Sequence, residues 1–322
     1  MDAYNLYAKL CLDSSEYEKG MKDAKSSAGG LTGLFEKVCS AASTVGKGIF
    51  TVAANVAKVS VAATTAGEAA VSALTTLAVN SYADYEQLVG GVETLYKDSA
   101  AKVQQYAADA YKTSGMTANA YMTTATSYAA ALVSSLGGDT ERAAELSNMA
   151  VSDMTDNWNK FGSSADSVQD AYNGFAKGQF QLLDNLKLGY GGTKEEMERL
   201  LDDANKLNAA QGKYTDYSID SFSDIILAIH DIQTEYDITG TTAKEASTTI
   251  SGSLSAAKAA WANLVTGVAD DNANFGQLIS NFVDSATTAA SNIIPRVEVA
   301  LNGAAKLIES CLLYTSDAAD DL

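Results

Sequence analysis

The chain has 322 residues, of which 47% are apolar and 19% charged, a length that accommodates one large domain or two of ordinary size. Its 22 basic and 40 acidic residues give a formal net charge of -18 without a basic patch, which argues against sequence-specific binding of nucleic acid. The three cysteines form no CxxC pair, which argues against a disulfide framework and a zinc site.

Residues 1–30 are predicted to form a strand followed by a helix. Apolar and polar residues alternate from Tyr4 to Leu12, the period-two pattern of one half-buried strand. Ser15 and Glu18 then have the spacing of a capping box, so we expect a helix that begins there and runs to the glycine break at residues 28–30. The opening residues lack the pattern of a secretory signal peptide, so we expect the chain to begin in the cytoplasm.

Residues 31–83 form a second segment that is poor in charge and rich in Ala, Val and Thr, and we expect it to be helical. Within it, residues 49–83 come nearest to a membrane-spanning sequence, but Lys58 and Glu68 interrupt them. The longest uncharged stretch, residues 69–83, is shorter than the roughly 18 apolar residues that a span requires. A stripe that is buried or packs between helices is therefore favoured over a transmembrane helix.

Residues 84–310 are predicted to consist of helices joined by short turns that contain glycine. The breaks expected in the first part are Gly90-Gly91, Ser114-Gly115 and Gly137-Gly138. A further turn is expected at residues 189–192, where Thr193 and Glu196 have the spacing of a capping box and start a helix. Apolar residues then line one face of this helix at Met197, Leu200, Leu201, Ala204 and Leu207.

Three later stretches repeat the helical spacing of apolar residues. Their apolar positions are Phe222, Ile225, Ile226 and Ile229, then Ala257, Trp261, Leu264, Val265 and Val268, then Phe275, Leu278, Ile279 and Phe282. The only proline, Pro295, is expected to stop or kink the chain after Ile294. The predicted fold class is mainly α: an elongated bundle or rod of long helices with one short N-terminal β-strand.

No catalytic chemistry is predicted. His230 is the only histidine, and the isoleucines around it mark the buried side of its helix, which favours a surface or hydrogen-bonded histidine over a catalytic base or metal ligand. The motifs HExxH, GxxxxGK[ST] and GxSxG are absent, and no GxGxxG is followed by a spaced acidic residue. An SxxK pattern, Ser255 to Lys258, lies within a predicted helix without its companion motifs. We therefore predict that the chain is not an enzyme and has no catalytic, cofactor-binding or metal-binding residues and no cofactor.

Two groups of acidic residues are interpreted as structural. The first gathers at the start of a predicted helix, at Glu195, Glu196, Glu198, Asp202 and Asp203. The helix dipole favours negative charge there, so a solvated face is preferred over a calcium or glycosidase site. The second, Asp270-Asp271-Asn272, lacks the spacing of an EF-hand and is expected to form a turn.

Residues 311–322 resemble a translation of the transposon-end adapter used in sequencing libraries. We interpret them as non-native, so that the native sequence would end near Ser310 and continue in a part of the gene that follows. On this interpretation Cys311 and Tyr314 have no role in the protein. Such a segment is excluded from reasoning about the fold.

Three stretches resemble tape measure proteins from the tails of phages and prophages of Gram-positive bacteria. Residues 182–201 read LLDNLKLGYGGTKEEMERLL and are similar to a typical segment of that family. Residues 243–271 read AKEASTTISGSLSAAKAAWANLVTGVADD and are similar to its later helical block, and YNLYAKLCLDSSEYEKGM resembles its strand-then-helix opening. The first of these stretches begins at residue 4 and the last ends at residue 271, so the resemblance extends over nearly all of residues 1–310.

The resemblance implies a structural virion protein that sets tail length, serves as a scaffold for tail assembly and is ejected with or ahead of the DNA. Its implied location is the lumen of the virion tail, after assembly in the host cytoplasm. The implied partners are copies of itself, the tail tube protein, tail assembly chaperones and distal tail proteins, with contact to the host membrane during ejection. The family offers no catalytic residues to transfer to this chain.

Two other functions stay open. The first is a membrane-active helical effector that uses residues 49–83 as its active surface, which a liposome leakage assay would detect. The second is the N-terminal part of a peptidoglycan hydrolase whose catalytic domain lies in a missing part of the gene.

Overall fold

The computed structural model describes residues 65–320, with side chains described for residues 74–297 and for Val299. The chain divides into two compact units, residues 1–80 and 81–322. The predicted N-terminal strand, the helix after it and most of the 31–83 segment lie outside the described residues. Between residues 65 and 320 the chain forms helices and no strand, which confirms the mainly α fold class. The predicted segment boundaries stay predictions.

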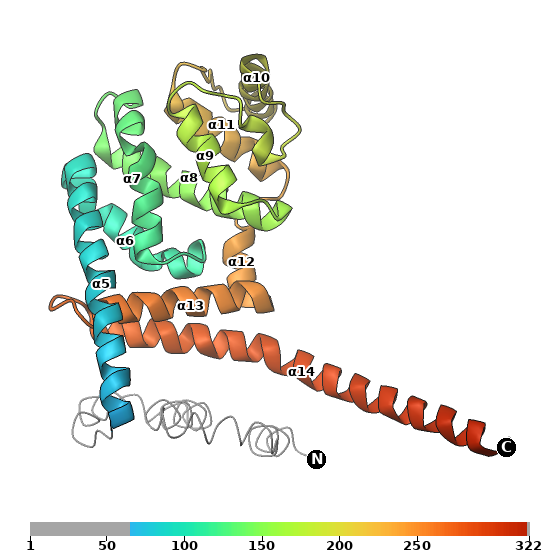
Figure 1. Ribbon diagram of the computed structural model, residues 1–322. Helices are drawn as coiled ribbons and strands as arrows, with labels where there is room; N and C mark the ends of the chain where they lie inside the picture. The colour runs from blue at the N-terminus through green and yellow to red at the C-terminus, as the bar shows by residue number, and fades with distance from the viewer. Residues whose placement is uncertain (1–64, 321–322) are drawn as a thin grey trace. The chain divides into compact units, whose positions relative to one another are not determined.

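The helices follow one another along the chain as drawn in Figure 1. They are α5 (Thr65–Tyr96), α6 (Ala100–Thr113), α7 (Ala118–Ser135), α8 (Thr140–Phe161), α9 (Ala165–Phe175), α10 (Lys194–Ala210), α11 (Phe222–Glu235), α12 (Thr241–Thr248), α13 (Ile250–Gly267) and α14 (Phe275–Asp320). Two short 3-10 helices, η2 (Lys97–Ser99) and η3 (Leu183–Leu186), lie between them. The longest connection separates α10 from α11, and the next longest flank η3 and join α13 to α14.

Helix α8 is the central element of the unit formed by residues 81–322, because α6, α7, α9, α11, α12 and η2 all pack against it. It begins at Asp139, whose carboxylate accepts a hydrogen bond from the Arg142 backbone N–H at 2.9 Å. It ends at Gly162, whose φ of 62° is a left-handed conformation that glycine adopts without strain. Its buried residues are apolar in the first half apart from Ser147, and several polar ones join them in the second half.

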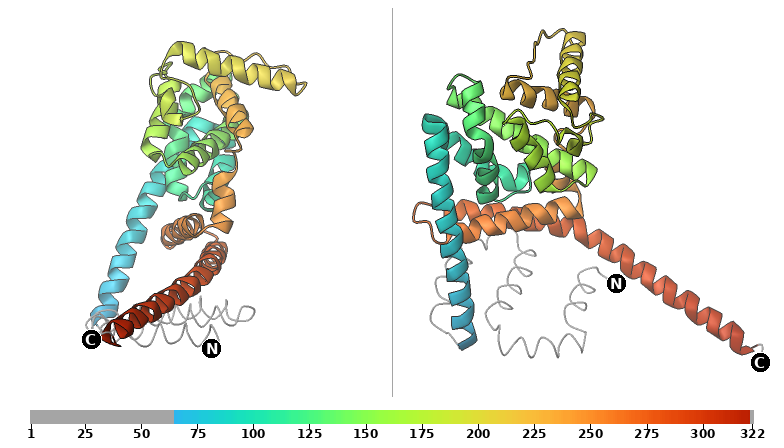
Figure 2. Two further views of the ribbon diagram at one scale, coloured as in Figure 1. Left: turned by 90° about the vertical axis from the view of Figure 1, so that its right-hand side faces the viewer. Right: turned by 45° about the horizontal axis from the view of Figure 1, so that its top comes forward.

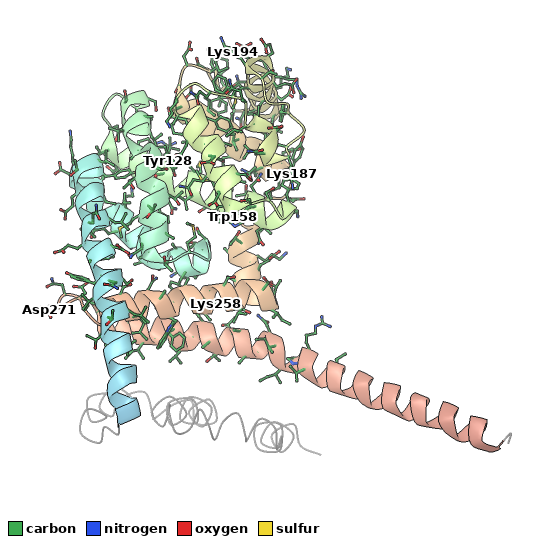
Figure 3. All side chains as sticks on the ribbon, viewed as in Figure 1. Tyr128, Trp158, Lys187, Lys194, Lys258 and Asp271 are labelled. Carbon is green, nitrogen blue, oxygen red and sulfur yellow. The ribbon has the colours of Figure 1, made fainter. Side chains whose placement is uncertain are left out.

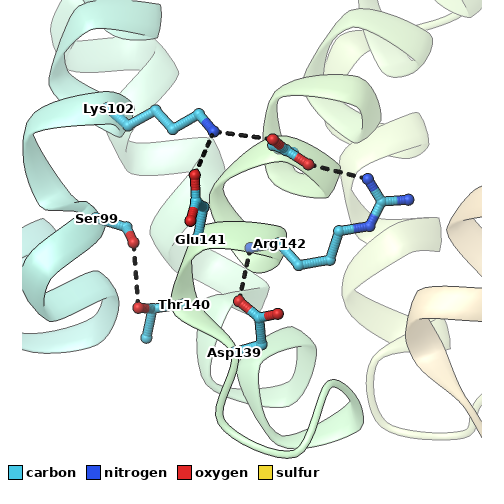
Figure 4. A network of polar contacts seen from close by, with 7 residues as sticks. Ser99, Lys102, Asp139, Thr140, Glu141 and Arg142 are labelled. Atoms are coloured by element: carbon cyan, nitrogen blue, oxygen red, sulfur yellow. Dashed lines mark hydrogen bonds and ion pairs between the residues drawn. The ribbon is translucent and has the colours of Figure 1, made fainter.

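An exposed charge network joins the start of α8 to α6 (Figure 4). The Lys102 Nζ lies 2.9 Å from Glu145 Oε1 and 3.4 Å from Glu141 Oε1, and Arg142 Nη1 lies 3.0 Å from Glu145 Oε2. Exposed ion pairs of this kind contribute only about 0–1 kcal/mol each. The network therefore helps to align α6 with α8, while apolar burial supplies most of the stability.

The apolar faces predicted for α10 and α11 are confirmed. Their buried members are Met197, Leu200, Leu201 and Ala204 on α10, and Phe222, Ile225, Ile226 and Ile229 on α11. The face predicted for α13 is confirmed in part, since Leu264 is buried but Trp261 and Val268 are 47% and 49% exposed. Trp261 instead packs against Phe282 of α14, with ring centroids 5.2 Å apart.

Two of the three predicted glycine breaks are confirmed. Helix α6 ends before residues 114–115 and α7 ends before residues 137–138, where the glycines have positive φ. The break predicted at residues 90–91 is wrong, because α5 passes through both glycines. The helix propensity that two glycines lose, about 1 kcal/mol each, is offset by burial of the residues that follow in α5. The chain breaks at η2, where Lys97 has a φ of 48°.

Helix α14 continues through Pro295, so the chain does not stop there, and the alternative that it kinks after Ile294 stays a prediction. A proline inside a helix removes one N–H donor, and the carbonyl it leaves free, at the exposed Ser291, is open to water. Helices α13 and α14 lie side by side in all views (Figures 1 and 2). Helix α14 also includes residues 311–320, and their interpretation as an adapter translation stays a prediction.

Candidate functional site

Buried polar side chains gather in the second half of α8. Asp153, Asp156 and Asn157 are 1%, 2% and 0% exposed, and each bonds to a different part of the unit. Two residues of α11, His230 and Gln233, lie on the facing side of the α8–α11 contact. These five residues are called the polar cluster below, and they form the candidate functional site.

Asp153 and His230 form the central pair of the polar cluster. The His230 Nδ1 lies 2.9 Å from Oδ1 and 3.0 Å from Oδ2 of the Asp153 carboxylate, so its N–H donates to that group. Burial raises the pKa of Asp153 to about 6, against the hydrogen bond from His230. The same hydrogen bond raises the pKa of His230 above its ordinary 6.5. The imidazole is 27% exposed and therefore reaches solvent, whereas the carboxylate does not.

Asp156 caps the start of α12 from outside that helix. Its Oδ2 accepts from the Gly240 backbone N–H at 2.6 Å and its Oδ1 from the Thr242 N–H at 2.7 Å. Helix α12 has no side-chain cap of its own, because its N-cap residue is Gly240. Burial raises the pKa of Asp156, and the two backbone N–H groups oppose that shift. One carboxylate of α8 therefore fixes where α12 begins.

Several fully buried polar atoms near this pair have no hydrogen-bond partner among the described residues. They are Asn157 Oδ1, the Gln233 Nε2 and Oε1 atoms, and the Tyr172 hydroxyl oxygen. Asn157 uses its Nδ2 to donate to the Leu186 carbonyl at 2.9 Å, which holds η3 on α8. The Tyr172 hydroxyl faces Gln233 without the geometry of a hydrogen bond. An unpartnered buried polar group costs about 1–3 kcal/mol, so the polar cluster is a weakly satisfied part of the interior.

Residues 182–201, whose sequence resembles tape measure proteins, form η3, a turn and the first part of α10. The Thr193 Oγ1 accepts from the Glu196 N–H at 3.2 Å, which confirms the predicted helix start. The reciprocal half of the predicted capping box is not formed, because the Thr193 N–H donates to the Gly191 carbonyl at 3.0 Å. The Glu196 carboxylate accepts from the Gly191 N–H at 3.0 Å, so it braces the preceding turn. Hydrogen bonds from Arg199 lower the pKa of Glu196. This carboxylate therefore has a structural role.

The aromatic residue of the same stretch is held between two charged side chains. The Arg199 guanidinium lies 4.3 Å from the centroid of the Tyr190 ring, and the Tyr190 hydroxyl donates to Asp203 Oδ2 at 3.2 Å. A Cβ atom at Gly192 would overlap the Gln181 carbonyl oxygen, so only glycine fits at that position. Packing of the turn against α10 and against Gln181 therefore explains why Tyr190 and Gly192 stand at these positions.

The other residues weighed from the sequence do not meet at a reactive site. Ser255 and Lys258 of the SxxK pattern are both exposed on α13, where Figure 3 labels Lys258. The predicted turn at residues 270–272 is confirmed, since the Asn272 N–H donates to Asp270 Oδ1 at 2.9 Å. Asp271 lies in the same loop between α13 and α14 (Figure 3).

Two open hollows flank the loop after α9. One, of about 290 Å³, is lined by residues between Asp170 and Leu182, and the other, of about 410 Å³, is lined by residues that include Phe180, Lys194 and Phe222. Neither is lined by a residue of the polar cluster.

Among the described residues, no three His, Cys, Asp or Glu side chains are placed to hold a metal ion, and no helix is long and apolar enough to cross a membrane.

Comparison of the chain with protein-family models, curated proteins and solved structures found no match. Asp153 orients the imidazole of His230 and compensates its charge, so the pair can take up and release a proton near neutral pH.

Sequence reasoning missed the acidic members of the polar cluster. Asp153 and Asp156 lie three residues apart on α8, and Asp153 falls beside Ala150 and Met154 on the apolar face of that helix. An acidic residue inside an apolar stripe is the signal that could have identified a buried carboxylate. The partner could not have been identified in the same way, because His230 is 77 residues away in sequence.

Proposed function

We propose that this chain is part of a phage tail tape measure protein, a structural component of the virion that sets tail length, supports tail assembly and is ejected with or ahead of the DNA. The observation that carries the proposal is the resemblance of residues 182–201 and 243–271 to that family. The described helical content supports it, because the length of a helix is proportional to its number of residues, at 1.5 Å per residue.

Helix α14 is the element best suited to such a ruler. It has 46 residues and a length of about 69 Å at 1.5 Å per residue. Its apolar residues repeat every seven positions in two series, Ile279, Ala286, Ile293, Ala300 and Leu307, and Val283, Ala290, Val297 and Ala304. These positions are called the α14 seam below. A seam of this spacing is typical of helices that wind around a copy of themselves.

The described part of the α14 seam includes exposed side chains. Val283 and Val297 are each 39% exposed, and the neighbouring Ile294 is 42% exposed. Association of these side chains with another copy would remove apolar surface from water at about 25 cal/mol per Å². The proposed partners are therefore copies of the chain itself, in an elongated bundle or rod, within a tube built from tail tube protein.

The remaining partners in the proposal are tail assembly chaperones and distal tail proteins, with contact to the host membrane during ejection. Assembly takes place in the host cytoplasm and the finished protein lies in the tail lumen. The formal charge of -18 supports this location, since a negative protein surface does not hold back DNA that passes through the same tube.

The DNA that flanks the coding sequence tests the proposal. A tape measure gene is expected to continue past the codon for Ser310 and to lie among genes for tail tube, chaperone and distal tail proteins. A stop codon soon after that position, among genes unrelated to phages, would overturn the proposal and favour the helical effector.

A further inference from the structure

The charges around Asp153 come from several helices. The titratable groups that face it are Asp156 of α8, Tyr128 of α7, Tyr172 of α9, and His230 and Asp231 of α11. The acidic residue of α12, Glu245, accepts a hydrogen bond from Asn159 Nδ2 at 3.0 Å. Asn159 lies on α8 beyond Asp153 and Asp156, towards the end of that helix. Among these groups the positive charge is carried by the His230 imidazolium, which interacts favourably with both Asp153 and Asp156.

We propose that Asp153 and His230 form a proton-operated latch, in which a proton on His230 holds α11 and the start of α12 against α8, and loss of that proton lets them open. The inference goes beyond the proposed function and does not rest on it. It follows from the 2.9 Å contact between the two side chains, from their unequal exposure, and from the two further carboxylates nearby.

Loss of the proton leaves a buried charge without compensation. Neutral His230 can still donate its Nδ1–H, but Asp153 then remains ionised and 1% exposed, with Asp156 and Asp231 of the same sign beside it. A buried charge that loses its partner strongly destabilises the closed arrangement. Movement of α11 away from α8 would bring water to the Asp153 carboxylate.

Neighbouring contacts lower the cost of opening in this region. The unpartnered Gln233 amide and Tyr172 hydroxyl would both gain hydrogen bonds to water on opening. Helix α12 follows α11 after a short turn, and only Asp156 caps its start. Displacement of α11 would therefore draw the Gly240 and Thr242 N–H groups away from that carboxylate.

The first test uses the fact that His230 is the only histidine of the chain, so a single imidazole signal reports the latch in an NMR titration. The expected pKa lies above 6.5, and it falls in the variant Asp153→Asn. The control Asp202→Asn removes the same charge from the exposed face of α10 and leaves the histidine pKa unchanged. A histidine pKa at or below 6.5, or one that Asp153→Asn does not lower, overturns the latch.

The second test measures opening directly, by hydrogen exchange of the full chain between pH 6 and pH 9, corrected for the intrinsic exchange rate. For residues 222–248 the opening constant is expected to rise above pH 6.5 by up to about tenfold per pH unit, as for release of one proton. Residues 100–113 of α6 serve as the internal reference and stay constant. In His230→Gln the buried Asp153 carboxyl still titrates, so the test uses the double variant Asp153→Asn/His230→Gln, in which the pair holds no titrating group and the pH dependence of opening is lost.

Either of two results in the exchange experiment contradicts the latch. One is an opening of residues 222–248 that varies with pH in the double variant as it does in the natural chain. The other is an equal pH-dependent rise in α6, which would mean that the whole unit loosens and that α11 and α12 are not released selectively.

Discussion

The Tyr96 hydroxyl lies 2.8 Å from Ser147 Oγ and donates a hydrogen bond to the Ala125 carbonyl oxygen at 3.0 Å. One buried hydroxyl thus joins α5, α7 and α8 inside the core. Burial raises the pKa of Tyr96 to about 12, so the hydroxyl stays protonated and able to donate throughout the neutral range.

Tyr96→Phe is expected to lower the free energy of unfolding by about 1–3 kcal/mol, because it leaves a buried Ser147 hydroxyl without this partner. Urea denaturation measures the change. Tyr214→Phe is the matched control, since Tyr214 is 93% exposed and its hydroxyl is free to bond to water. Equal stability of the two variants would show that the Tyr96 hydrogen bonds contribute nothing.

Gly192→Ala is expected to destabilise the turn before α10 by about 1–3 kcal/mol, because the new Cβ would overlap the Gln181 carbonyl oxygen. Gly191→Ala is the control at the neighbouring position, where the Cβ would lie 3.5 Å from Glu196 Cγ, an ordinary contact. Thermal unfolding of the two variants should separate them by several degrees. A Gly192 variant as stable as the Gly191 variant would contradict the packing described for this turn.

Stability of the natural chain should fall as pH rises across the range in which the polar cluster titrates. The folded pKa of Asp153 is raised from 3.8 to about 6, and that of His230 is raised above 6.5. A group that binds its proton more tightly when folded stabilises the protein below its unfolded pKa, and this contribution is lost as pH rises through the folded pKa. The contribution of Asp153 is therefore lost between about pH 4 and pH 6, and that of His230 above pH 6.5.

Asp153→Asn removes the first of these contributions and weakens the second. Between pH 4 and pH 6 the free energy of unfolding should decline less steeply than in the natural chain, by up to about 1.4 kcal/mol per pH unit. Urea denaturation at a series of pH values measures the slope, with Asp202→Asn as the control for general charge repulsion. Parallel slopes for both variants and the natural chain would show that Asp153 does not titrate as described.

Self-association through the α14 seam should be sensitive to a charge placed in it. Val297→Asp puts a carboxylate at a 39% exposed seam position, so the variant is expected to fold normally and to dissociate at higher concentrations than the natural chain. Ser291→Asp adds the same charge to an exposed position outside the seam. Sedimentation equilibrium should show weaker association for Val297→Asp alone, and equal association of both variants would exclude the seam as the contact surface.

The local signals of the sequence predicted a good part of the fold. The helix start at Thr193 and the apolar spacing of α11 each depend on residues within a few turns of one another, and the structure confirms both. The glycines at residues 90–91 misled because their low helix propensity is outweighed by burial of residues further along α5. Of the stop or kink predicted at Pro295, the stop does not occur, since a single lost N–H donor does not end a 46-residue helix.

The candidate site was much less predictable than the helices. Asp153 meets His230 across 77 positions, and Asp156 caps a helix that begins 85 positions later, at Thr241. Pairings of this range arise only when α11 and α12 pack on α8, and no local pattern encodes them. The prediction that His230 is a surface or hydrogen-bonded residue agrees with its contact to Asp153, but the burial of that carboxylate, which gives the pair its chemistry, was not foreseen.

The most direct test of the ruler is the tail length of phages that carry altered copies of this gene. One variant lacks residues 293–306, two heptads of α14 beyond the Asn292 contact with the turn between α12 and α13, and the other contains them twice. At 1.5 Å per residue the mean tail lengths measured by electron microscopy should differ by about 42 Å. Tails of identical mean length in the two phages would contradict the role of this chain as the ruler.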